Sequence, residues 1–143
     1  MHFDELPRFE ILSDGTVVAR AGTLTNCAGI AAVHARICLS GDRGLSVFPD
    51  YDPAWPGNRF GPRVPGAAIP EPLRSAIIAG VATVVQTCGG ALGIQYELLD
   101  ALIDPVDGNQ RRFVEAGARS LREWLRMCHP TFLSSDSEEG TCC

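Results

Sequence analysis

Lysine is absent from the sequence, so all 12 basic residues are arginine. This absence excludes a P-loop, whose lysine holds the β- and γ-phosphates, and it excludes catalysis through a Schiff-base lysine. A G-x-G-x-x-G dinucleotide motif is also missing. We therefore expect no nucleotide partner and no bound cofactor. The exclusive use of arginine has two open interpretations. Either it reflects genomic base composition, which the abundant alanine and glycine also favour, or it provides a surface for bidentate contacts to phosphate or carboxylate.

Long apolar runs and cysteine motifs for metal binding are absent as well. No segment approaches the ~20 apolar residues of a membrane span, so we expect no membrane partner. The six cysteines show no C-x-x-C or His/Cys ligand spacing, which argues against a zinc site. The N-terminal segment has acids where a secretory signal has basic and apolar residues, so we expect a cytoplasmic protein with reduced thiols. Four cysteines are expected to pack as small hydrophobic residues in or beside apolar segments: Cys27, Cys38, Cys88 and Cys128.

What is present suffices for one domain with its own core. The chain has 143 residues, of which 45% are hydrophobic and 20% are charged. A chain of this length buries roughly 68% of its unfolded surface, which makes stabilising cross-links unnecessary. We expect a single domain over residues 1–130 and a disordered acidic tail over residues 131–143.

The formal charge of −5 is unevenly distributed along the chain. Residues 1–107 carry a net −5, residues 108–128 carry +3, and the segment from residue 129 carries −3. The acidic total argues against a general nucleic-acid binder, because such domains are usually basic. One basic segment nevertheless lies late in the sequence, between an acidic body and an acidic tail.

Hydrophobic periodicity predicts an α+β fold. Two β-prone runs, 8–12 and 16–20, flank Asp14-Gly15 and predict a β-hairpin. Further strands are predicted over 31–39, 45–48 and 94–103, and helices over 70–87 and 110–128. The proline-rich stretch 49–70 is expected to be an ordered loop whose aromatic residues lie over apolar surface. This order predicts a β-α-β-α sandwich in which both helices pack on one face of a mixed sheet.

The two predicted helices differ in their outer faces. Helix 70–87 is apolar nearly all round, which is typical of a buried helix or of one at an interface. Helix 110–128 is amphipathic, with an apolar face formed by Phe113, Gly117, Leu121, Trp124, Leu125 and Cys128. Its polar face carries Arg111, Arg112, Glu115, Arg119, Arg122, Glu123 and Arg126. Such a face is either simply solvated or contacts RNA phosphates, and it lacks the aromatic residues that stack on bases.

Catalytic and metal-binding candidates are few. His34 is the best-placed general base, and Cys38 projects from the same face of the predicted strand 31–39. No third residue completes a nucleophile–base arrangement, and a structural histidine is the alternative. Asp100, Asp104 and Asp107 are candidates for binding a cation, but they lack the EF-hand spacing, and turn formation explains the last two better. We therefore assign no catalytic residue and no metal ligand.

The segment 60–81 resembles domain IV of the translocation GTPases, the family of elongation factor G and elongation factor 2. The match begins with a phenylalanine, Phe60, and a short charged stretch that contains Arg63. It continues with a run ending in Ile-Pro, Val64–Pro70, and with a helix that contains the Gly-Val pair Gly80-Val81. Residues 102–108 and the alanine-rich segment 116–121 take the places of the family's Leu-x-Asp-Gly strand end and second helix. The resemblance implies a ribosomal protein S5 domain 2-like fold over residues 20–128, in agreement with the predicted order of elements.

In that family, loops at the domain tip enter the decoding site of the ribosome. The resemblance therefore implies a stand-alone, non-catalytic module that binds the ribosome or RNA. The arginines expected to contact phosphates are Arg111, Arg112 and Arg119, and the expected tip-loop residues are Thr25, Asn26, Asn109 and Gln110. The family's tip motifs and its GTPase domain are not kept, so neither translocation nor GTP hydrolysis is implied.

Two other functions stay open. A protein-interaction or regulatory domain, which includes a homo-oligomer, would use the apolar helix 70–87. A small hydrolase would use His34, with Cys38 near it.

Overall fold

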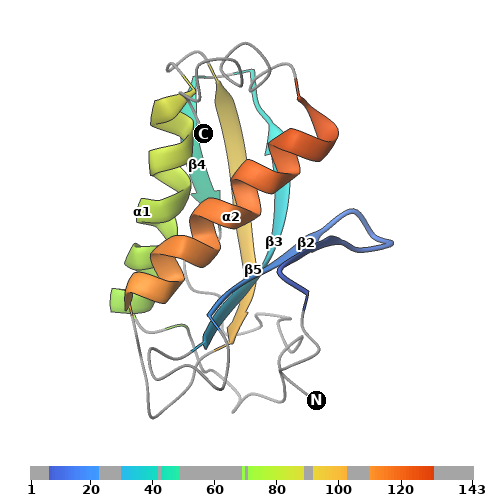
Figure 1. The fold of residues 1–143 in the computed structure, drawn as a ribbon. Helices are drawn as coiled ribbons and strands as arrows, with labels where there is room; N and C mark the ends of the chain where they lie inside the picture. The colour runs from blue at the N-terminus through green and yellow to red at the C-terminus, as the bar shows by residue number, and fades with distance from the viewer. Residues whose placement is uncertain are drawn as a thin grey trace.

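The described part of the chain forms one mixed sheet and two helices (Figure 1). A computed structural model describes residues 7–22, 30–41, 43–48, 69, 71–88, 92–102 and 110–130. The strands are β1 (Phe9–Ile11), β2 (Val17–Gly22), β3 (Ile30–Leu39), β4 (Gly44–Phe48) and β5 (Gly93–Leu102); the helices are α1 (Glu71–Thr87) and α2 (Gln110–Cys128). The strand order is β1-β2-β3-β5-β4, and β4 pairs with β5 in parallel whereas the other pairs are antiparallel.

The β1–β2 hairpin turns where the sequence has Asp14-Gly15. Gly15 has a φ of 86°, a left-handed conformation that glycine adopts without strain. The carboxylate of Asp14 accepts hydrogen bonds from the backbone N–H of Thr16 at 3.0 Å and from its hydroxyl at 2.6 Å. The turn is therefore fixed by its own side chains, as in an Asx turn.

Strand β3 lies in the middle of the sheet. From Val33 to Cys38 its burial alternates as the sequence predicts, whereas its first four residues, 30–33, are all buried. Its core-facing residues Ala31, Val33, Ala35 and Ile37 are buried. Its register against β5 shifts at His34, which pairs with Asp100, whereas the next residue of β3 pairs with Leu98. Strand β5 therefore has one extra residue at this point, a β-bulge.

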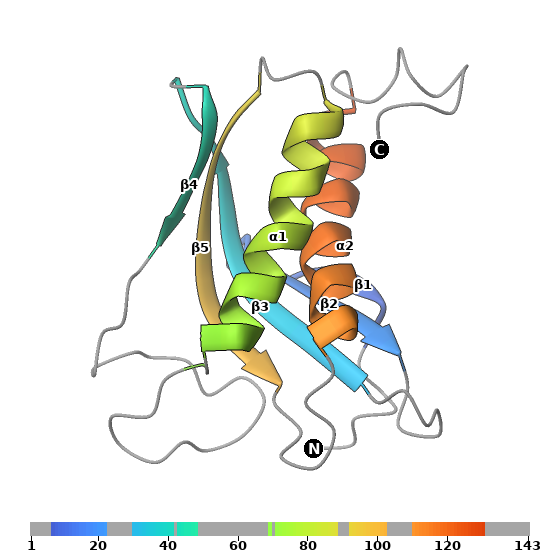
Figure 2. The same cartoon turned by 90° about the vertical axis from the view of Figure 1, so that its left-hand side faces the viewer.

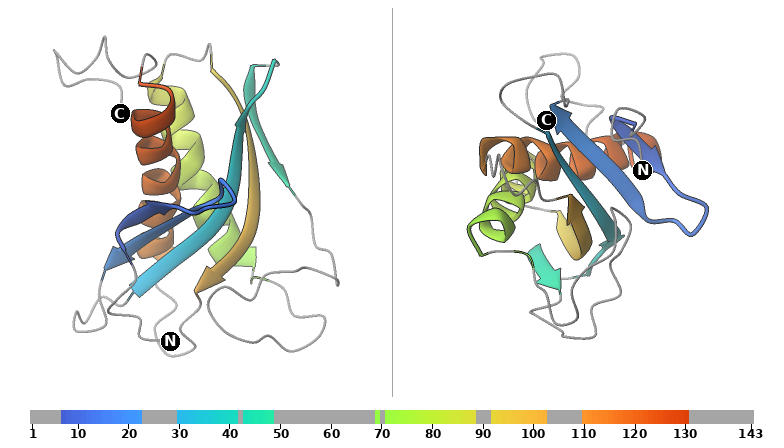
Figure 3. Two further views of the ribbon diagram at one scale, coloured as in Figure 1. Left: turned by 90° about the vertical axis from the view of Figure 1, so that its right-hand side faces the viewer. Right: turned by 90° about the horizontal axis from the view of Figure 1, so that it is seen from below.

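Both helices cover the same face of the sheet (Figures 2 and 3). Helix α2 packs over β1, β2 and β3, α1 contacts β4, and the two helices lie against each other. The core between helices and sheet is apolar apart from the hydroxyl groups of Tyr96 and Ser120, two residues that have no exposed surface. Because the hydroxyl of Ser120 donates to the carbonyl of Gly117 at 2.6 Å, the Tyr96 hydroxyl donates to Ser120 Oγ at 2.7 Å. Burial raises the pKa of Tyr96, so this hydroxyl stays a donor.

The two helices touch at a glycine in each of them. A Cβ atom on Gly80 would lie 2.0 Å from the carbonyl oxygen of Val114, and one on Gly117 would lie 2.3 Å from that of Ile77. These glycines therefore allow the backbones of α1 and α2 to approach more closely than any side chain permits. This contact explains why residues of low helix propensity occupy the middle of both helices.

The fold confirms the predicted α+β class and the placement of both helices on one face. Helix 110–128 has the predicted bounds, and α1 begins one residue later than predicted. The apolar face of α2 is buried as expected, but Cys128 is exposed because it is the last residue of the helix. Cys38 is exposed too, because it lies on the face of β3 opposite the helices, near the strand end. The prediction that these two thiols pack as small hydrophobic residues is therefore wrong.

Helix α1 is less apolar on its outer side than its composition suggests. Val85 belongs to the core, and the exposed positions in the middle of the helix are Ser75, Ala79, Thr83 and Gln86. Neither helix in the described residues is long and apolar enough to cross a membrane. The predicted aromatic loop up to residue 68, the acidic tail and Cys27 lie outside the described residues.

Candidate anion-binding site

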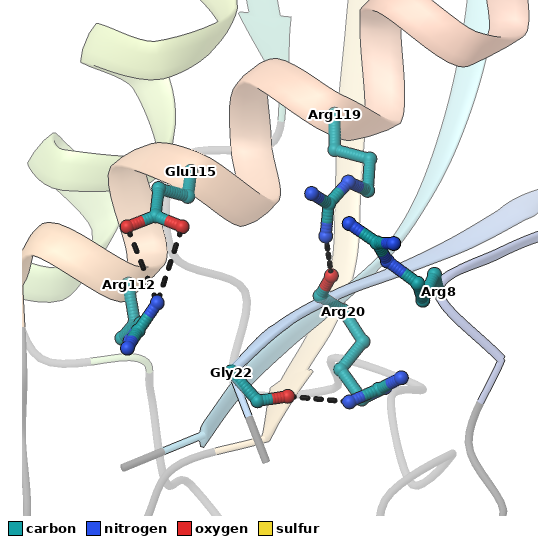
Figure 4. A pocket seen from close by; sticks show the side chains of 6 residues that line it. All are labelled: Arg8, Arg20, Gly22, Arg112, Glu115 and Arg119. Carbon is teal, nitrogen blue, oxygen red and sulfur yellow. Dashed lines mark hydrogen bonds and ion pairs between the residues drawn. The ribbon is translucent and has the colours of Figure 1, made fainter. Parts of the chain in front are cut away.

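Four arginines from three parts of the chain line one hollow of about 290 Å³ (Figure 4). Arg8 directly precedes β1, Arg20 lies on β2, and Arg112 and Arg119 lie on α2. Gly22 and Glu115 complete the lining. The hollow is therefore formed where the edge hairpin passes α2.

The hairpin places Arg8 and Arg20 opposite each other. Phe9 pairs with Ala19, and the backbone N–H of Arg20 donates to the carbonyl of Arg8 at 3.0 Å, which continues the pairing by one position. The pairing therefore places two guanidinium-bearing residues side by side at this end of the hairpin.

Backbone carbonyls orient two of the four arginine side chains. The Nη1 atom of Arg119 donates to the carbonyl of Arg20, and Nη1 of Arg20 donates to the carbonyl of Gly22 (Figure 4). These acceptors are neutral carbonyls, so neither of these two hydrogen bonds neutralises a guanidinium charge. The hydrogen bond from Arg119 also joins α2 to the hairpin, so both sides of the hollow are held together.

Among the described residues that line the hollow, positive charge exceeds negative charge. Arg112 forms an ion pair with Glu115 at 3.3 Å, and Glu115 is the only acid that lines this hollow within the described residues. Burial lowers the pKa of Arg119, and the positive charges of Arg8 and Arg122 lower it further. Arginine nevertheless keeps its proton in proteins, so Arg119 remains a cation in an electropositive environment. A bound anion would relieve this repulsion.

A second hollow, of about 460 Å³, continues along α2 from the first. The two share Arg8 and Arg119, and the second is also lined by Phe9, Arg122, Glu123 and Met127. We call the two hollows together the arginine groove. The described residues that line it include five arginines and two glutamates, which together carry a formal charge of +3 in a chain whose total is −5. The geometry suits an extended polyanion with some apolar surface.

The structure brings together two of the three arginines predicted to contact phosphate. Arg112 and Arg119 line the groove, whereas Arg111 is exposed in the first turn of α2 and lines neither hollow. Of the predicted tip-loop residues, Gln110 is exposed at the start of α2. Thr25, Asn26 and Asn109 lie outside the described residues.

Sequence reasoning missed the contribution of the hairpin. Arg8, Phe9 and Arg20 were assigned only to predicted strands, and nothing in their spacing relates them to a helix about 100 residues later. The available signal was an arginine at the outer end of each hairpin strand. In an antiparallel hairpin, such ends are neighbours.

A second polar cluster surrounds His34 on β3. The Thr16 hydroxyl donates its proton to Asp14, so the 2.9 Å contact between His34 Nε2 and Thr16 Oγ1 is donated by the histidine. The hydrogen bonds to Thr16 lower the pKa of Asp14. This Asp14–Thr16–His34 chain joins the hairpin turn to β3, and it supports the structural interpretation of His34.

The proposed partner of His34 is too distant for catalysis. Cys38 lies four residues along β3 from His34, a separation of about 13 Å in a strand. Asp100, which pairs with His34 across the strands, is buried, and its Oδ1 atom accepts the N–H of Ala101 at 2.8 Å. Within the described residues, no group of His, Cys, Asp or Glu side chains has the arrangement of a metal site. Asp104 and Asp107 lie outside the described residues.

Comparison of the chain with protein-family models and with curated proteins finds no match.

Proposed function

We propose that the protein is a non-catalytic RNA-binding module that holds phosphates in the arginine groove. The observation that carries this proposal is the convergence of Arg8, Arg20, Arg112 and Arg119 on one hollow. Guanidinium groups donate paired N–H bonds that match phosphate oxygens, and they keep their charge at any physiological pH. RNA presents such phosphates at regular intervals along an extended chain.

Charge distribution supports a localised contact. A formal +3 in the groove against −5 for the whole chain means that a polyanion is attracted here and repelled elsewhere. The resemblance to domain IV of elongation factor G suggests the ribosome as the place where such RNA is met. In this proposal Arg112 and Arg119 keep the role expected of them, and the hairpin arginines are added.

The alternative functions have less support from the described residues. A protein-binding face on α1 would need large exposed apolar side chains, but its exposed middle positions are Ser75, Ala79, Thr83 and Gln86. A hydrolase centred on His34 would need a nucleophile within hydrogen-bond reach, and Cys38 is not.

The test is RNA binding by fluorescence anisotropy at low salt, with the double substitution Arg8→Gln and Arg112→Gln. These substitutions leave intact the hydrogen bond from Arg119 to the carbonyl of Arg20, which joins α2 to the hairpin. We expect the affinity to fall roughly a hundredfold or more, because each of the two lost charge-assisted hydrogen bonds contributes about 1.5–3 kcal/mol. The matched control is Arg43→Gln with Arg74→Gln, which removes the same charge away from the groove and should change affinity little. Equal losses in both variants, or no RNA binding by the unaltered protein, would contradict the proposal.

A further inference from the structure

We infer that the arginine groove binds single-stranded nucleic acid in preference to a duplex, with bases held against Phe9 and Met127. This inference rests on the proposed function and specifies the form of its ligand. It follows from the composition of the second hollow, which differs from that of the first.

The second hollow places apolar side chains beside the arginines. Met127 is 63% exposed, and the only other exposed large hydrophobic residue in the described part of the chain is Leu39. Phe9 extends from β1 to the same hollow, and it also packs partly against the core. Helix α2 has no aromatic residue on its polar face, so the hairpin supplies the aromatic ring that this face lacks.

Aromatic side chains stack on the face of a base only where that base is unstacked from its neighbour. In a duplex the base faces are covered by their neighbours, and proteins reach mainly phosphates, sugars and base edges. In a single strand the faces are free to stack on aromatic rings and on guanidinium planes. Phe9 and Arg122, which line the same hollow as Met127, are side chains of these two kinds.

The length and charge of the groove fit a short single strand. Residues 112 to 127 of α2 extend over about 22 Å along the helix axis, a distance that about six stacked nucleotides cover. The five arginines are distributed over both hollows, so positive charge accompanies the apolar surface along this length. A peptide of acidic residues would satisfy the charge, but it has no aromatic base to stack on Phe9.

Fluorescence anisotropy with matched ligands tests the inference. The ligands are oligouridine of about 12 nucleotides, a base-free sugar-phosphate strand of the same length, an RNA duplex of that length and the corresponding thymidine DNA strand. We expect oligouridine to bind more tightly than the base-free strand and the duplex. Either ranking of the RNA and DNA strands supports the inference, and the ranking shows whether the 2′-hydroxyl is recognised.

Substitutions then assign the base contact to its side chains. Met127→Ala should weaken oligouridine binding roughly fivefold and leave the base-free strand unaffected. Phe9→Leu, which keeps an apolar side chain against the core, should act in the same direction. The matched control is Leu39→Ala, which removes the other exposed hydrophobic side chain and should change neither affinity.

Several results would overturn the inference and leave the proposed function standing. These are equal affinity for oligouridine and the base-free strand, tighter binding of the duplex, and an unchanged affinity in Met127→Ala. Equally tight binding of a polyglutamate peptide would assign the groove to acidic segments of proteins instead. Failure of every nucleic acid to bind would instead contradict the proposed function itself.

Discussion

Replacing Gly117 with alanine should destabilise the protein, although alanine is the better helix former. A Cβ atom at this position would lie 2.3 Å from the carbonyl oxygen of Ile77, whereas ordinary van der Waals contact begins at 3.4 Å. The helices must therefore separate by about 1 Å, and the obstacle is backbone that cannot rotate away. Overpacking of this kind costs up to about 3 kcal/mol, and alanine recovers about 1 kcal/mol of helix propensity. We expect a net loss of about 2 kcal/mol in the free energy of unfolding.

Urea denaturation followed by circular dichroism measures this loss. Ala79→Gly is the control: it measures the difference in helix propensity between alanine and glycine at an exposed position of α1, away from the contact between the helices. It should lower the free energy of unfolding by about 1 kcal/mol. Gly80→Ala should resemble Gly117→Ala. The double variant should lose less than the sum, because a single separation of the helices accommodates both methyl groups. A Gly117→Ala protein that is more stable than the unaltered chain would refute the close approach of the two backbones.

Other consequences concern buried polar groups and the hairpin turn. Tyr96→Phe removes the hydroxyl that donates to Ser120, so it should lower the free energy of unfolding by about 1 kcal/mol. Urea denaturation measures this loss. An unchanged free energy of unfolding would show that this buried hydrogen bond contributes nothing to stability. The pKa of Asp14 lies below its ordinary value of 3.8, so the ionised carboxylate stabilises the folded state above that pH, and this contribution is lost as the pH falls through the lowered value. Asp14→Asn should therefore be less stable than the unaltered protein at neutral pH, and the difference should disappear in thermal melts at strongly acidic pH. A difference independent of pH would show that the charge of Asp14 has no part in it.

Local sequence patterns were sufficient to predict the strands and helices of this fold. The Asp14-Gly15 turn, the alternation along β3 and the amphipathic pattern of α2 each depend on near neighbours, and each predicted its element nearly residue for residue. The same local patterns did not predict that Cys38 and Cys128 are exposed. Whether a residue at the end of an element is covered depends on what the rest of the chain places beside it.

Only some residues of the candidate site could be predicted from the sequence, for a related reason. Arg112 and Arg119 are on one helix, so their common face follows from helical periodicity. Arg8 and Arg20 join them through the crossing of the hairpin over α2, and crossing geometry has no local sequence pattern. Local patterns also gave no indication that Phe9 supplies an aromatic ring to a helix face that has none.

The salt dependence of RNA binding tests the central claim most directly, because each phosphate contact releases bound counterions. A groove with a net +3 on a single strand predicts that log K falls against log salt with a slope of about −2. Removing two charges with Arg8→Gln and Arg112→Gln should reduce the slope to about −0.7, whereas the Arg43→Gln and Arg74→Gln control should keep about −2. Equal slopes in all three proteins, or binding that does not depend on salt, would contradict the account.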